Sequence, residues 1–171
     1  MSLLKLLSVS EKEECKVEID FYVPFSVEIG DSFNFKKENI VYWRTGDIER
    51  SLIEIGIGSN TGILRRITLT SFKKASVKNV ALKDIEIEEG TPVFDAGIIP
   101  KKGIFDFISD FEVYLGKDSI IAMIEKVDKC RKIIRMDRVD IGIDNQNNIT
   151  HIAINNLDFK EYNELKDALK L

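Results

Sequence analysis

The sequence predicts a mainly β fold, an antiparallel sandwich or half-barrel of about eight to ten short strands with a short α-helix at the C-terminus. Three observations predict it. Apolar and polar residues alternate along much of the chain, two polar loops are flanked by apolar runs, and helical spacing occurs only near the C-terminus. Because 44% of the 171 residues are hydrophobic and no Gly/Ser-rich linker divides them, we expect one globular domain, residues 1–171.

The first three expected strands lie in the N-terminal third of the chain. In residues 15–23 every odd position is apolar, and Lys or acidic residues occupy the even positions up to Asp20. Residues 25–29 follow the same pattern, residues 39–44 are expected to form a third strand, and each run precedes a turn that contains glycine. Alternation with a period of two places the apolar residues on one face, as in a half-buried strand.

Two hairpins are the clearest local predictions. Residues 53–57 and 63–69 flank a five-residue polar loop, in which Gly62 can adopt the left-handed conformation that ends such a turn. Residues 139–143 and 149–154 flank a second loop of the same length.

The two hairpins share their chemistry. In each, an acidic residue lies on the same strand face as a glycine, Glu54 with Gly56 and Asp140 with Gly142. A glycine inside a strand marks a bulge or the close approach of another backbone or ring. The likeness fits two similar hairpins packed across a sandwich, and it also fits an internal duplication.

The other segments complete the fold. Residues 85–88 alternate, residues 105–115 alternate loosely, and residues 119–127 fit either a strand or a helix. Asp158 and Glu161 form a capping-box pattern, which predicts a short amphipathic helix on a sheet face or across one end of the sheet.

Composition and charge make several classes of protein improbable. The net charge of −4, from 25 basic and 29 acidic residues, does not favour direct nucleic-acid binding. The longest apolar run, residues 120–124, is too short to span a membrane, and the N-terminus makes a poor secretory signal. Cys15 and Cys130 are far apart and fit no redox or metal spacing, so we expect reduced thiols and a cytoplasmic protein.

We predict no catalytic, cofactor or metal site. The glycines of residues 56–62 precede a strand, whereas a phosphate-binding loop needs a helix there. His151 is the only histidine and is expected to be partly buried in a strand, on the face of Ile149 and Ala153. Carboxylates are too abundant for their number to indicate a hydrolase, which stays an alternative.

A run of acidic residues is the best candidate for a binding surface. Asp84, Glu86 and Glu88 alternate with isoleucines, so their carboxylates share one face, and basic residues gather in other segments. This face is either simply solvated or a docking patch for a basic partner. The candidate partner-binding residues are Asp84, Glu86, Glu88, Glu89, Asp95, Asp106 and Asp110.

The hairpin SLIEIGIGSNTGILRRITLT at residues 51–70 resembles one found in bacterial toxin-immunity proteins, including the immunity partners of contact-dependent growth inhibition and other polymorphic toxins. The VDIGID and ITHI segments of residues 139–152 are similar. The resemblance implies a protein that neutralises the C-terminal domain of a cognate toxin, often a nuclease, by covering its active site or an adjacent surface. An acidic patch would suit a cationic toxin, and no individual residue carries over from the family.

A different class of function is also compatible with the sequence. Tyr42 and Trp43 could form an exposed aromatic platform for a small ligand or carbohydrate. Trp43 shares its expected strand face with Val41, however, and this favours a place in the core.

Overall fold

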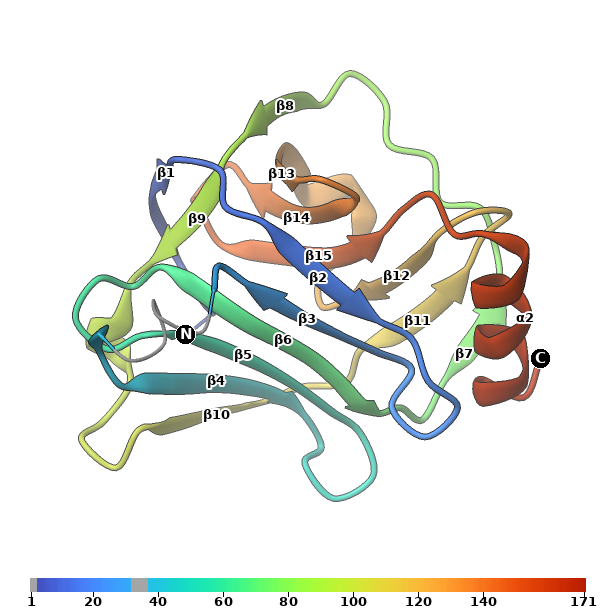
Figure 1. The fold of residues 1–171 in the computed structure, drawn as a ribbon, viewed down its shortest axis with the longest axis horizontal. Helices are drawn as coiled ribbons and strands as arrows, with labels where there is room; N and C mark the ends of the chain where they lie inside the picture. The colour runs from blue at the N-terminus through green and yellow to red at the C-terminus, as the bar shows by residue number, and fades with distance from the viewer. Residues whose placement is uncertain (1–2, 32–36) are drawn as a thin grey trace.

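Alternating apolar residues build two sheets that pack face to face in the computed structural model, which describes residues 3–31 and 37–171 (Figure 1). The first sheet has six strands in the order β10-β4-β5-β6-β3-β2. These strands are β2 (Cys15–Glu18), β3 (Phe25–Ile29), β4 (Ile40–Gly46), β5 (Leu52–Gly58), β6 (Leu64–Ser71) and β10 (Ile104–Ile108).

The second sheet has seven strands in the order β7-β11-β12-β15-β14-β13-β8. They are β7 (Ala75–Val77), β8 (Glu86–Glu89), β11 (Glu112–Leu115), β12 (Ile120–Met123), β13 (Cys130–Met136), β14 (Val139–Asp144) and β15 (Ile149–Ile154). The remaining elements are the paired strands β1 (Leu6–Ser10) and β9 (Thr91–Phe94), the 3-10 helices η1 (Ala96–Ile98) and η2 (Val127–Lys129), and the helix α2 (Phe159–Ala168).

The predicted mainly β sandwich with a short C-terminal helix is confirmed. Two details differ from the prediction: the described part of the chain contains fifteen strands, and three of the strand pairs are parallel. The expected strand of residues 15–23 ends at Glu18, because the chain then turns and the Asp20 carboxylate accepts a hydrogen bond from the backbone N–H of Tyr22. Residues 119–127 form the strand β12 and the start of η2.

One continuous apolar core lies between the sheets, and the two similar hairpins face it from opposite sides. The hairpin of β5 and β6 lies in the middle of the first sheet, and that of β14 and β15 lies within the second. Trp43 is 0% exposed and stacks on Phe107 at 5.9 Å between ring centroids. The prediction that Trp43 is a core anchor is therefore confirmed.

The helix α2 covers one end of the sandwich, beside β7 (Figure 1). The capping box predicted for Asp158 and Glu161 is present, and Leu165 and Leu169 are buried in the core. Glu161 also accepts two hydrogen bonds of 2.7 Å from Arg138, which ties the first turn of the helix to the β13–β14 turn. No helix of residues 3–31 and 37–171 is long and apolar enough to span a membrane.

Residues 78–85, which we call the crossing segment, join the two opposite edges of the seven-stranded sheet (Figure 1). Six strand spacings separate β7 from β8, about 29 Å in a flat sheet. The nine residue steps from Val77 to Glu86 can span about 30–32 Å when extended, which is enough to cross the sheet. The segment passes over the outer face of the sheet, and its Val80 packs on an apolar cluster of Ile121, Met123 and Ala153.

Candidate functional site

The seven acidic candidates lie in three separate parts of the molecule and do not form one patch. Asp84 to Glu89 lie in or next to β8, whereas Asp95 caps η1 by accepting a 2.9 Å hydrogen bond from Gly97. Asp106 lies on β10, in the other sheet, and Asp110 follows that strand. Closeness in sequence misled the prediction here, because the chain crosses between the sheets after β9.

Both acids of the β10 region are held in ion pairs within the protein. Asp106 accepts two hydrogen bonds from Arg44, of 2.7 and 3.1 Å, and this contact lowers the pKa of the carboxyl group. Asp110 lies 2.7 Å from the ammonium of Lys73, which also pairs with Asp47. Their charges are largely compensated by these partners, so they add little to an acidic binding surface.

The part of the prediction that survives as one surface is the edge strand β8. Asp84 lies before the strand in a left-handed conformation with φ of 54°, so the expected alternation does not extend to it, while Glu86 and Glu88 share a face as expected. Glu89 and Ile87 point to the opposite face, so carboxylates lie on both faces of the sheet along this edge. Glu88 pairs with Lys132 of β13, whereas Glu86 and Glu89 are exposed.

The outward side of β8 also presents main-chain groups. The strand is the last in its sheet and pairs in parallel with β13, and the backbone N–H of Gly90 donates to Arg135. Backbone groups of alternate residues face the same neighbour, so those of Ile87 and Glu89 point away from β13. The side chain of Ile87 is 48% exposed. Within the described residues no strand pairs with this outer side of β8.

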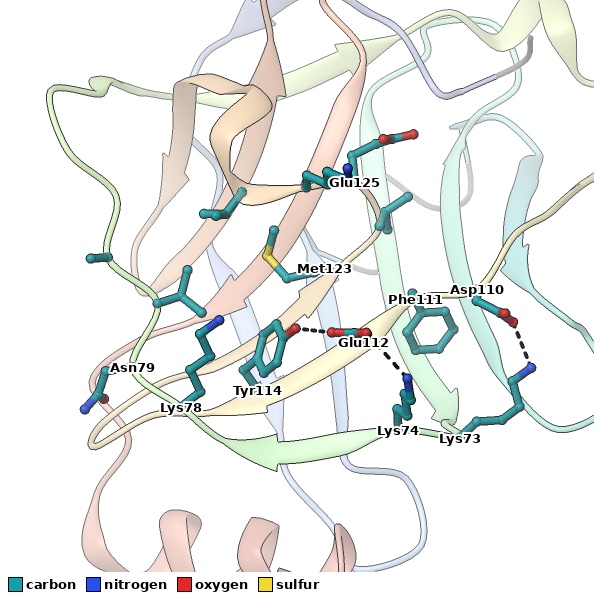
Figure 2. A pocket seen from close by; sticks show the side chains of 15 residues that line it. Lys73, Lys74, Lys78, Asn79, Asp110, Phe111, Glu112, Tyr114, Met123 and Glu125 are labelled. Atoms are coloured by element: carbon teal, nitrogen blue, oxygen red, sulfur yellow. Dashed lines mark hydrogen bonds and ion pairs between the residues drawn. The ribbon is translucent and has the colours of Figure 1, made fainter.

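A groove of about 960 Å³ lies on the outer face of the same sheet, toward the edge opposite β8. It opens between the crossing segment, strands β11 and β12, and the chain that follows β12. We call it the β11–β12 groove (Figure 2). Tyr114 and Met123 line it from the two strands, Val80 from the crossing segment and Val127 from η2. The groove borders the small apolar cluster beneath the crossing segment, and the two share Met123, Tyr114 and Val80.

Charged side chains surround the groove. Glu112 accepts a hydrogen bond from the Tyr114 hydroxyl, which raises the pKa of the tyrosine, and its carboxylate lies 3.9 Å from Lys74. Figure 2 shows the Lys78 ammonium directed toward the space between Tyr114 and Met123, 5.1 Å from the centre of the tyrosine ring. The site therefore combines apolar walls with cations at its edge.

Sequence reasoning did not identify this groove, although one signal was present. Residues 120–124 are apolar at every position, which indicates burial on both faces of β12. One face packs in the main core, and the other, with Ile121 and Met123, forms the cluster beneath the crossing segment. That Val80 and Lys78 would meet this face depends on the path of the crossing segment, which local sequence does not specify.

A buried polar cluster lies on the same outer face, deeper in the sheet. Asp140 accepts two hydrogen bonds from Arg135, of 2.8 and 2.9 Å, and one from Asn155. His151 is 1% exposed, and burial lowers its pKa to about 4. The glycine prediction is confirmed here, because a Cβ at Gly142 would lie 2.2 Å from the His151 ring.

The prediction that His151 shares a strand face with both Ile149 and Ala153 is wrong for Ile149. Ile149 packs in the main core, whereas Ala153 belongs to the outer cluster. The strand pairing shifts register between Gly142 and Ile143, and this irregularity breaks the simple alternation that put His151 and Ile149 together.

Other expected features have clear positions. Trp43 is buried, so it cannot form the exposed aromatic platform considered for a carbohydrate. Cys15 and Cys130 are free thiols, and burial raises the pKa of Cys15 to about 12. In residues 3–31 and 37–171, no three His, Cys, Asp or Glu side chains are grouped so that they could hold a metal ion.

Comparison with known proteins adds no family. No protein-family model matches the chain, and no curated protein sequence is significantly similar to it.

Proposed function

We propose that this chain is an immunity protein, which binds the C-terminal domain of a cognate toxin and neutralises it by covering its active site or an adjacent surface. The resemblance of the hairpin at residues 51–70 suggests this role. In the fold, the proposal is supported by the acidic edge strand β8, which has both outward-facing main-chain groups and exposed carboxylates. The partner surface that fits this edge is a basic one.

The edge suits a partner that adds a strand. Backbone groups of Ile87 and Glu89 can pair with an extended segment, and Ile87 offers an apolar contact. Glu86 and Glu89, on opposite faces, would meet Lys or Arg side chains on both faces of the added strand. The same charges oppose pairing between two copies of this chain, since two acidic edges repel each other.

Electrostatics would also govern how fast the complex forms. Carboxylates that are exposed and not fully compensated steer a cationic partner and reject an acidic one. If the toxin is a nuclease, its basic surface holds nucleic-acid phosphates, and the β8 edge would compete for that surface. Inhibition then requires only occlusion, without chemistry by this chain.

Co-expression tests the proposal. Bacteria that produce the toxin domain encoded beside this gene should survive when the chain is produced with it, and lose that protection with the double substitution E86K/E89K. The control D167K changes an exposed acid on α2 and should protect as the parent does. Thermal unfolding of the variants confirms that they are folded. If the parent chain gives no protection, the immunity proposal is wrong; if E86K/E89K protects fully, the assigned surface is wrong.

A further inference from the structure

We infer that the β11–β12 groove binds a small amphipathic anion, a molecule with an apolar body and a single carboxylate. This site is separate from the β8 edge and does not depend on the proposed function. It rests on the shape of the groove, its apolar walls and the distribution of charge around it.

The walls supply an apolar surface, of which Met123 is mostly buried while Tyr114 and Val80 are half-buried. Met123 and Tyr114 lie on the outer face of β12 and β11 as diagonal neighbours, because Met123 pairs with Glu112 and Tyr114 pairs with Ile121. Val80 and Val127 face them from the crossing segment and η2. A volume of about 960 Å³ accommodates a ligand of ordinary small-molecule size.

The charges select the head group. On one side the acids already have partners: Asp110 pairs with Lys73, and Glu112 lies near Lys74. On the other side Glu125 pairs with Lys129, 3.1 Å away. Lys78 and Lys126 also line the groove, and neither forms an ion pair in the described part of the chain.

These two lysines give the groove an uncompensated positive charge next to an apolar wall. A carboxylate would sit beside Lys78, whose ammonium lies 5.1 Å from the centre of the Tyr114 ring, with Lys126 adding positive charge to the lining. The apolar body would lie against Met123 and Val80. A cationic ligand would be repelled by the same ammonium groups, and a carbohydrate would leave its hydroxyls against apolar side chains without partners.

Binding can be measured with decanoate as the ligand and decylamine as its matched cation. The chain has three methionines. In protein labelled at the methionine methyl carbons, decanoate should shift the NMR signal of Met123 in a saturable way. The signal of Met136, which is fully buried in the main core, should stay in place. Decylamine should produce no saturable shift at either residue.

Charge reversal tests the head-group assignment. The double substitution K78E/K126E should weaken decanoate binding by about tenfold or more, and K101E, at an exposed lysine of the turn before β10, should leave it unchanged. An unshifted Met123 signal would overturn the site, and equal binding of decanoate and decylamine would overturn the charge selection. Retained decanoate binding in K78E/K126E would do the same. None of these results changes toxin protection, so this site and the proposed function fail separately.

Discussion

The buried imidazole of His151 should make the folded protein less stable as the pH falls. Its pKa is lowered from 6.5 to about 4 by burial, while Asp140 acts in the opposite direction. Between these two values the unfolded chain binds a proton on His151 and the folded chain does not. Protonation therefore favours unfolding, and stability is lost as the pH falls from about 6.5 to about 4. The full shift corresponds to about 3 kcal/mol of unfolding free energy.

Urea unfolding of the wild type and of His151→Phe measures this contribution. Phenylalanine keeps a planar ring beside Gly142 but does not titrate. Carboxylates titrate in both proteins, so their effects cancel in the comparison. Between about pH 7.5 and about pH 4 the wild type should lose about 3 kcal/mol more than the variant. Equal losses, or an NMR titration of this single histidine near pH 6.5 in the folded protein, would show that His151 is not held neutral by burial.

Three further predictions concern the fold. Gly142→Ala should destabilise the protein by about 1–3 kcal/mol in urea unfolding, because the new methyl group meets the ring of His151 at 2.2 Å; an unchanged midpoint would contradict this contact. Asp158→Ala removes the N-cap of α2 and should cost about 1 kcal/mol by the same measurement, with no loss expected if the cap is unimportant. Burial, and secondarily Asp137, raise the pKa of Cys15 to about 12. Iodoacetamide should therefore label Cys15 at neutral pH only after unfolding, and rapid labelling of the folded protein would contradict this.

The local predictions that held depend on residues close together in the chain. Gly62 has the positive φ of 75° that the first hairpin needed, and Gly142 has a ring against it as its position in a strand indicated. The capping box of Asp158 is encoded within four residues. In each case a turn, a strand or a helix end needs a particular residue type at that position. The need can be recognised from the residues beside it, so the local sequence is sufficient to predict the feature.

The predictions that failed depend on which distant segments meet. Arg44 and Asp106 are 62 positions apart, and they pair only because β10 lies in parallel beside β4. The β11–β12 groove exists because the crossing segment passes over the outer face of the sheet, which no local pattern specifies. The sequence therefore could not show which of the seven candidate acids lie together at β8 and which lie in other parts of the fold.

Calorimetric titration of the purified chain with the toxin domain encoded beside its gene measures whether the two form a complex. We expect a one-to-one complex whose affinity falls as salt is raised, and falls by about tenfold or more with E86K/E89K but not with D167K. Undetectable binding at low salt would contradict the immunity role. Tight binding that is indifferent to salt and to E86K/E89K would contradict the acidic β8 edge as the surface that carries it.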